Sequence, residues 1–419
     1  MILDFNRGWT FRKEGGDAAL IDLPHDAMLA ERRDPCCPAG KQSGYFPGGK
    51  YIYEKRFTLD QVDAKKSIAL SFGGVYQNCA VEVNGIPAGT HKYGYTPFVL
   101  DISGMVRAGE NTVTVHVDNS LQPNCRWYTG SGMYRPVELW IRDSCHIEQV
   151  RITTLSVAPA VVRVDVTTTQ PCEIAVQIYD GERLVASGAP GELTIPGARL
   201  WSAETPHLYT CAVKTATDEQ TVSFGIRTLT WSAKGGLCIN DVETKLRGGC
   251  IHHDHGVLGA CTYPDAEERR VRILKETGYN AIRCAHNPAS KALLDVCDKL
   301  GMYVMDEAFD GWYTPKNYHD YARWFDGEWQ NDLTAMVENA RNHPSVIMYS
   351  IGNEVSETAE DKGVEVCRQM ADFVRALDPT RPVTAGVNVL LNVYVRMGMG
   401  VYRDKGRYKP DPLPPVRGR

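Results

Sequence analysis

The sequence contains no long apolar segment, no closely spaced cysteine pair other than the adjacent Cys36 and Cys37, and no strong excess of either charge. No apolar stretch approaches the roughly 20 residues that a membrane-spanning helix needs, so we expect no membrane partner. A net charge of −5 gives no electrostatic basis for binding nucleic acid or an anionic surface. The 13 cysteines form no CxxC pair of the kind found in zinc sites. Reduced thiols, and a first segment without a basic, apolar leader, together predict a cytoplasmic protein.

The composition is that of a soluble globular protein, with 43% hydrophobic and 23% charged residues. Its 419 residues are enough for about two to four domains. In residues 1–145, short alternating segments such as 51–57, 79–83 and 111–117 predict strands with one buried face. Glycine, proline and asparagine separate them, which predicts a jelly-roll β-sandwich. Trp140 lies in one of these strands, and we interpret it as part of the core.

Two further units follow along the chain. Residues 146–230 contain short strands and predict a small immunoglobulin-like β-sandwich. In residues 231–396, strands alternate with amphipathic helices, which predicts parallel βαβ units and about five of the eight units of a (β/α)8 TIM barrel. Residues 397–419 end in a proline-rich, basic segment without apolar periodicity and predict an irregular tail.

The stretch 342–354 carries the strongest functional signal. It opens with Asn342-His343-Pro344, which ends a helix because proline lacks the N–H that a helix needs. The apolar run 346–351 predicts a buried strand, and Asn353 and Glu354 follow directly. Barrels present catalytic groups at the carboxyl ends of their strands. The alternative is that Glu354 only caps the next helix.

Polar side chains also end the other predicted barrel strands. Because the carboxyl ends of parallel strands meet at one edge, we expect these groups to converge on one pocket. Metal binding by the histidine cluster is an alternative, but adjacent strand residues point to opposite faces, so at most alternate members share a site. The same argument makes one of Asp306 and Glu307 structural. The strand-end residues are His252, His253, Asp254, Arg283, His286, Asp306, Glu307, Asn353 and Glu354.

The loop 126–132 has the sequence Arg-Trp-Tyr-Thr-Gly-Ser-Gly, and we do not assign its aromatic residues to the predicted core. It combines aromatic side chains with an arginine in a segment rich in glycine. Such a loop is suited to stacking on the face of a sugar ring. We therefore expect Arg126 and Trp127 to reach over the mouth of the barrel.

At these motifs the chain resembles glycoside hydrolase family 2, the β-galactosidases, β-glucuronidases and β-mannosidases. The segment 280–288, Asn-Ala-Ile-Arg-Cys-Ala-His-Asn-Pro, resembles the first signature of the family, and 342–354 resembles the second. The resemblance extends over about 395 residues and includes the domain order. It implies a carbohydrate substrate, hydrolysis with retention and no cofactor.

The resemblance also implies residue roles. Glu354 would be the general acid/base, and Asn353 the partner of the sugar 2-hydroxyl. His253, His286 and Arg283 match residues of the sugar subsite. Gly352 and the loop at Arg126 and Trp127 favour a β-galactosidase, with a β-glucuronidase or β-mannosidase as the alternative. Large enteric β-galactosidases have metal ligands where this chain has Gly311 and Tyr313, so no metal site is carried over.

The family nucleophile is a glutamate downstream of the acid/base, yet the sequence contains no glutamate after Glu365. We therefore expect a truncated family member with little or no activity of its own. Glu307 is the remaining carboxylate that could substitute. A non-catalytic carbohydrate-binding remnant is the alternative from another functional class. The sequence leaves homo-oligomerisation open.

Overall fold

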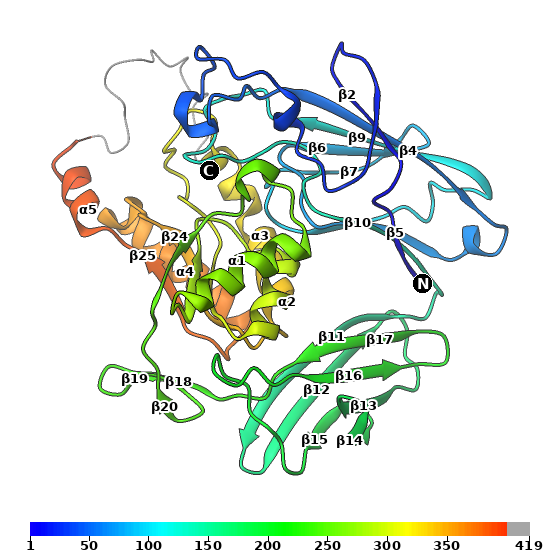
Figure 1. The fold of residues 1–419 in the computed structure, drawn as a ribbon, viewed down its shortest axis with the longest axis vertical. Coiled ribbons are helices and arrows are strands. Elements are labelled where there is room, and N and C mark those ends of the chain that lie inside the picture. Colours follow the sequence, from blue (N-terminus) through cyan, green and yellow to red (C-terminus); the bar gives the residue numbers. More distant parts are fainter. Residues whose placement is uncertain (400–419) are drawn as a thin grey trace.

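The structure, a computed structural model, describes residues 1–399 (Figure 1). Two β-sandwiches each pack against a mixed unit of parallel strands and helices. This order of jelly roll, immunoglobulin-like sandwich and partial barrel confirms the predicted fold class. In the described residues no helix is long and apolar enough to cross a membrane.

The jelly roll consists of two facing antiparallel sheets. One has the strand order β1-β10-β5-β8 and the other β3-β2-β4-β9-β6-β7. The strands are β1 (Ile2–Asp4), β2 (Trp9–Lys13), β3 (Ala19–Ile21), β4 (Lys50–Leu59), β5 (Ser67–Phe72), β6 (Cys79–Val83), β7 (Ile86–His91), β8 (Phe98–Asp101), β9 (Gly109–Asp118) and β10 (Val137–Arg142).

Alternation of side chains builds this sandwich. In β9, Val113, Val115 and Val117 are buried while the residues between them face outward. The same period makes the expectation for Trp140 wrong. Its neighbours in β10 occupy the core side, so Trp140 points to the opposite face, where the Arg142 guanidinium lies 4.2 Å from its ring centroid.

The second unit is a sandwich of a three-stranded sheet, β11-β12-β15, and a four-stranded sheet, β14-β13-β16-β17. Its core is a separate cluster of aliphatic residues around Val164, Ile178 and Val213. The strands are β11 (Ile147–Val157), β12 (Ala160–Thr168), β13 (Ala175–Asp180), β14 (Arg183–Gly188), β15 (Gly191–Thr194), β16 (Tyr209–Lys214) and β17 (Glu219–Phe224).

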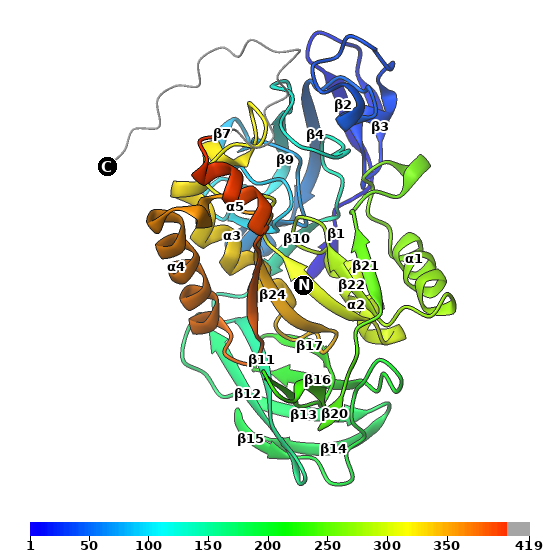
Figure 2. The ribbon, with the colours of Figure 1, turned by 90° about the vertical axis from the view of Figure 1, so that its left-hand side faces the viewer.

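The third unit is a five-stranded parallel sheet in the order β21-β22-β23-β24-β25, with helices along it (Figure 2). A small antiparallel sheet, β18 (Leu229–Ser232), β19 (Gly236–Ile239) and β20 (Val242–Glu243), precedes it and was not predicted. The parallel strands and helices are β21 (Gly248–Ile251), α1 (Pro264–Glu276), β22 (Ala281–Cys284), α2 (Lys291–Leu300), β23 (Tyr303–Glu307), α3 (Phe325–Ala340), β24 (Val346–Asn353), α4 (Asp361–Leu377), β25 (Val383–Gly386) and α5 (Val389–Arg396).

Short 3-10 helices occupy several loops: η1 (Ala27–Ala30), η2 (Gly40–Ser43), η3 (Asp63–Lys65), η4 (Gly256–Leu258), η5 (Tyr321–Arg323) and η6 (Glu357–Ala359). The helix boundaries of the parallel unit follow local signals. Pro264 occupies the first turn of α1, and the Ser290 hydroxyl caps α2 by accepting from the Leu293 N–H. Helix α5 was not predicted, and the irregular tail lies outside the described residues from 400 onward.

The jelly roll and the parallel unit share one hydrophobic core. Tyr76, Tyr93, Tyr95 and Tyr134 of the jelly roll are buried in the same cluster as the residues beneath β22 to β24. The Tyr93 hydroxyl also donates to the carbonyl of Ala308, just past β23, at 2.6 Å. The jelly roll is therefore fixed against the carboxyl ends of the parallel strands.

Candidate functional site

Glu354 stands at the centre of the candidate site. It follows β24 directly, so the strand ends by delivering Asn353 and then Glu354 to the edge that faces the jelly roll. Its backbone has a φ of 44°, in the left-handed region that non-glycine residues rarely adopt. One carboxylate oxygen, Oε2, lies 3.6 Å from Nη1 of Arg126, and Oε1 lies 3.4 Å from Nδ2 of Asn388.

A chain of hydrogen bonds links the ends of β22, β23 and β24. Arg283 donates from Nη2 to the side-chain oxygen of Asn353 at 2.9 Å and to Glu307 at 2.6 Å. Glu307 also accepts from the Ser350 hydroxyl at 2.6 Å and contacts Nδ1 of His286 at 2.5 Å. The sequence-predicted Asn353, Arg283 and His286 are thus brought together with Glu354.

Asp306 and Glu307 point to opposite faces, as their adjacent places in a strand predict. Glu307 joins the site, whereas Oδ1 of Asp306 accepts the N–H of Ala289 ahead of α2. Both side chains are fully buried. Burial raises the pKa of Asp306 to about 7. Asp306 is therefore the structural member of the pair.

The jelly roll contributes the loop with Arg126 and Trp127. The Trp127 ring centroid lies 5.6 Å from that of His286 and 5.1 Å from that of His252, and its Nε1 donates to the Tyr95 hydroxyl. Trp127 is half-buried rather than exposed, because these rings cover it. The loop reaches the mouth of the barrel, 184 residues away from Asp310 in sequence, to which Arg126 donates two hydrogen bonds.

His252 and His253 point in different directions. The His253 ring packs between Tyr95 and Tyr134, and its Nε2 lies 3.1 Å from the carbonyl of Thr129. Burial, and then the charge of the nearby Arg135, lower the pKa of His253 to about 3, so it is neutral at pH 7. His252 instead faces Trp127, and its ring centroid lies 6.1 Å from that of His286. The geometry favours His252 over His253 as the histidine of the cleft.

Asp310 and Lys316 belong to the site but were not predicted from the sequence. Asp310 accepts from Asn353 Nδ2 at 3.0 Å, from Lys316 Nζ at 3.1 Å and from Arg126. The neighbouring cations and hydrogen bonds hold the pKa of Asp310 well below its usual range despite burial. In the sequence, Asp310 is three residues past the end of a predicted strand and Lys316 follows six residues later. This spacing does not by itself predict that the two side chains form an ion pair. No cluster of three metal-binding side chains occurs among residues 1–399.

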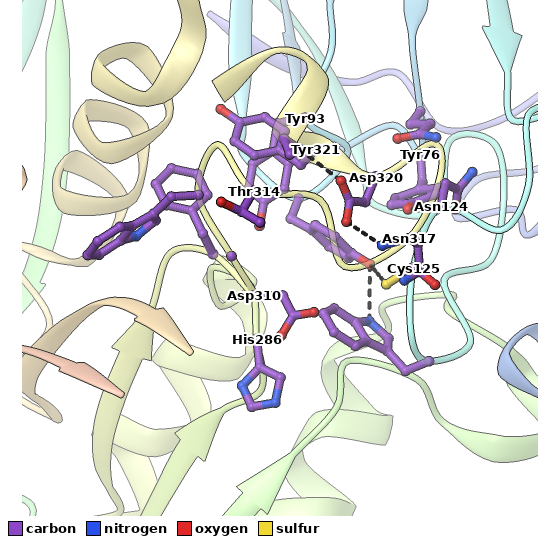
Figure 3. A pocket seen from close by; sticks show the side chains of 17 residues that line it. Tyr76, Tyr93, Asn124, Cys125, His286, Asp310, Thr314, Asn317, Asp320 and Tyr321 are labelled. Carbon is purple, nitrogen blue, oxygen red and sulfur yellow. Dashed lines mark hydrogen bonds between the residues drawn. The ribbon is translucent and has the colours of Figure 1, made fainter. Parts of the chain in front are cut away.

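A pocket adjoins the cluster around Glu354, between the jelly roll and the loop after β23. It contains about 520 Å³ of space, including open solvent at its mouth. His286 and Asp310 line one end and Tyr76 and Asn124 the other, as Figure 3 shows, with Trp127 also in the wall. Aromatic rings interspersed with amides and carboxylates are suited to a sugar, which presents apolar faces and hydroxyl edges.

A carboxylate at the end of a parallel strand, near an aromatic pocket between barrel and jelly roll, is typical of multidomain glycoside hydrolases. Comparison with known proteins agrees. Family models for the sugar-binding domain, the middle domain and the TIM barrel domain of glycosyl hydrolases family 2 match residues 44–142, 145–227 and 233–408. The chain belongs to glycosyl hydrolase family 2.

Several relatives are similar over nearly the whole chain. A β-galactosidase of Bacteroides ovatus is 36% identical over 92% of this chain and 54% of its own length. A β-glucuronidase of Bacteroides fragilis is 27% identical, covering 91% of this chain and 60% of its own. The crystal structure of a family 2 member from Bacteroides cellulosilyticus superimposes with a TM-score of 0.88 at 38% identity, covering 92% and 56% of the two chains. This chain therefore spans little more than half of these relatives.

Proposed function

We propose that this chain carries the acid/base half of a retaining β-galactosidase site, with Glu354 as the general acid/base. The observation that carries the proposal is the position of Glu354 directly after β24 and Asn353, whose side chain is joined through Arg283 to Glu307 and His286. In the first step a protonated Glu354 would give its proton to the glycosidic oxygen. In the second it would take a proton from the attacking water.

Asn353 has a geometry suited to the sugar 2-hydroxyl. Its side-chain oxygen accepts from Arg283, and one of the two Nδ2 hydrogens is directed to Asp310. The amide orientation is therefore fixed, and the second Nδ2 hydrogen can be donated to a ligand. A hydrogen bond to the 2-hydroxyl that tightens as the oxocarbenium-like transition state forms would increase the rate.

The charges of the site support a neutral sugar over a uronic acid. Arg126 is paired with both Asp310 and Glu354, Lys316 with Asp310, and Arg283 with Glu307, so three cations face three carboxylates. These pairs leave little unbalanced positive charge for the carboxylate of a glucuronide. Relatives of both names have similar identities, 36% for a β-galactosidase and 32% for a putative β-glucuronidase, so the choice rests on the charges of the site.

Residues 1–399 contain no carboxylate that we can assign as the nucleophile. The retaining reaction needs a second carboxylate about 5–5.5 Å from the acid. Glu307 accepts from Arg283, Ser350 and His286, so its oxygens are already engaged. Asp310 is engaged in the same way by Arg126, Lys316 and Asn353. We therefore expect a nucleophile from additional barrel units, supplied by a longer form or a second polypeptide.

The test is an assay of the purified chain on nitrophenyl β-galactoside, β-glucuronide and β-mannoside, beside Glu354→Gln and Glu307→Gln. General acid catalysis alone is worth about 10²–10⁴-fold, so we expect turnover far below the 10⁶–10¹⁷-fold typical of enzymes. Adding the C-terminal barrel segment of the Bacteroides ovatus relative should produce galactosidase activity that Glu354→Gln abolishes. Robust turnover by the chain alone would reveal a nucleophile among its own residues.

A carbohydrate-binding protein without catalysis is the second candidate. The engagement of both Glu307 and Asp310 in ion pairs favours it. Its signature would be calorimetric binding of galactose or lactose with no hydrolysis, even after the additional barrel segment is supplied. Glu354→Gln would then leave the affinity largely unchanged.

A further inference from the structure

Arg126 is held by the barrel rather than directed at the pocket. Its Nε and Nη2 donate to the two oxygens of Asp310 at 2.7 and 2.5 Å, in the bidentate geometry that is strongest for an arginine and a carboxylate. The remaining nitrogen, Nη1, lies 3.6 Å from Oε2 of Glu354. Arg126 therefore bridges the carboxylate of Asp310 and that of the proposed acid/base.

Lys316 holds the same carboxylate from the other side. Its Nζ donates to the Asp310 side chain at 3.1 Å, to the Asp310 carbonyl at 2.5 Å and to the Asn353 carbonyl at 2.7 Å. The side chain is 5% exposed, so the ammonium is buried with acceptors in three directions. The bond to the Asn353 carbonyl fixes the peptide group that joins Asn353 to Glu354.

That peptide group matters because Glu354 adopts a left-handed backbone conformation. A non-glycine residue in this region is strained and persists only where its surroundings enforce it. Lys316 enforces it through the preceding carbonyl, and Arg126 restrains the side chain that follows. The loop bearing Lys316 is itself ordered by Asp320, which accepts the N–H groups of Lys316 and Asn317.

We propose that Arg126, Asp310 and Lys316 are positioning residues that fix the orientation and charge of Glu354, and that Arg126 is not a sugar ligand. The proposal rests on the proposed role of Glu354 as acid/base. Asp310 is the shared anchor: it holds Arg126, Lys316 and the Asn353 amide at once. Because Arg126 belongs to the jelly roll, docking of that domain completes the barrel site.

Several charged and polar groups around Glu354 can affect its titration, so the test must distinguish the effect of Arg126 from theirs. Each packed element contributes: Arg126 from the jelly-roll loop, Asp310 and Lys316 from the loop after β23, Glu307 from β23, Arg283 and His286 from the end of β22, and Asn388 before α5. Arg126 makes an ion pair with Glu354 and its side chain is 23% exposed, so its removal is the least disruptive probe.

The experiment is a carbon-13 NMR titration of the full chain with glutamate labelled at the side-chain carboxyl carbon. Glu354→Gln assigns the Glu354 signal by its loss. An opposite charge within about 4–6 Å typically lowers a carboxyl titration midpoint by one to three pH units, and partial exposure reduces the effect. We expect Arg126→Gln to raise the Glu354 midpoint by about one pH unit, and Arg126→Lys to restore most of the difference.

Arg151→Gln is the matched control, because Arg151 also makes an ion pair across a domain boundary, but its pair with Glu338 joins β11 to α3 and does not involve the carboxyl end of β24. It should leave the Glu354 midpoint unchanged. An unchanged midpoint in Arg126→Gln, with the fold verified by circular dichroism, would overturn the proposal. So would weaker galactose binding in Arg126→Gln without any change of the Glu354 titration, since that identifies a sugar ligand.

The titration does not depend on turnover. Failure of the proposed function would appear as absent hydrolysis in the reconstituted assay, whatever the Glu354 midpoint does. Lys316→Met provides a second variant: it should also raise the Glu354 midpoint, because a cation and the restraint on the Asn353 carbonyl are both lost. A Glu354 midpoint in Lys316→Met that is equal to or lower than that of the wild type would contradict the role of Lys316.

Discussion

Gly352 lies against the indole of Trp312, two residues before Glu354. A Cβ at this position would lie 2.7 Å from Trp312 Nε1 and 2.8 Å from a methyl carbon of Val355. Trp312 is completely buried, and its Nε1 donates to the Ile351 carbonyl at 2.8 Å. Packing therefore requires glycine here, which removes Gly352 as evidence for a particular sugar specificity.

We expect Gly352→Ala to destabilise the fold by about 1–3 kcal/mol, because the indole must move to admit the methyl group. Urea denaturation would measure the loss, and tryptophan fluorescence would report the displaced ring. Gly327→Ala in α3 is the control, since a Cβ there has no neighbour within 4 Å and alanine favours the helix. Equal stabilities of Gly352→Ala and the wild type would contradict the packing argument.

Asp306 is a second residue whose burial has a measurable consequence. Its pKa is raised from 3.8 to about 7, so the folded state favours the protonated acid. The associated stability is fully present below about pH 4 and is lost as the pH rises through about 7. Wild-type stability should therefore carry a penalty above neutral pH that an uncharged side chain avoids.

We expect Asp306→Asn to be more stable than the wild type at pH 8, by up to about 4 kcal/mol, and not at pH 4. Asparagine retains an oxygen for the Ala289 N–H. Denaturation series at both pH values would measure the difference, with the exposed Asp295→Asn in α2 as control. Parallel pH profiles for Asp306→Asn and the wild type would show that Asp306 ionises without cost.

At the scale of elements, the segment between α3 and β24 joins the barrel to the immunoglobulin-like unit. The Asn342 side chain accepts from the Ile152 N–H at 3.0 Å and donates to the Val150 carbonyl at 2.8 Å, both in β11. Arg227, just after β17, donates to the Pro344 and Val346 carbonyls. The Asn-His-Pro segment thus ends a helix and also docks a neighbouring domain.

Asn342→Ala should cost about 1–3 kcal/mol, because it leaves backbone groups of β11 without their partners. We also expect the single unfolding transition to broaden or split as the second sandwich becomes less coupled to the barrel. Calorimetry would record both effects. Asn331→Ala, at an exposed position of the preceding helix α3, is the control and should behave like the wild type. A wild-type profile for Asn342→Ala would refute the docking role.

At the scale of the whole molecule, the parallel sheet has two edges that are unpaired in the part of the chain that the structure describes. β21 and β25 each have one neighbouring strand. Helix α5 beside β25 exposes apolar side chains, with Val389 72%, Leu390 56% and Val393 45% exposed. Unpaired strand edges next to apolar surface promote association between chains.

We expect the isolated chain to associate as its concentration rises, and Val389→Glu with Val393→Glu to suppress this. Sedimentation velocity across a concentration series would measure it. Val62→Glu, at a position 65% exposed on the jelly roll, is the matched control and should associate like the wild type. If the wild-type chain stays monomeric at every concentration, the apolar surface of α5 does not mediate association.

The sequence by itself determined the local elements and the order of the domains. Alternation and apolar runs predicted strands β4, β6, β9 and β24, and the alternation of strands with amphipathic helices predicted the parallel unit, although not its last helix, α5. The sequence also placed Asn353 and Glu354 at the end of a strand. These features depend on residues within a few positions of one another, so short-range patterns suffice to reveal them.

Only the tertiary structure decided which side chains share the site. It paired Arg126 with Asp310 across 184 positions, turned His252 rather than His253 toward the cleft and placed Trp312 against Gly352. Such contacts depend on how the jelly roll docks onto the barrel and on which face each strand-end residue occupies. Neither the docking nor the face can be read from a periodic pattern in the sequence. Alternation along a strand shows which residues share a face, but not which element packs against that face.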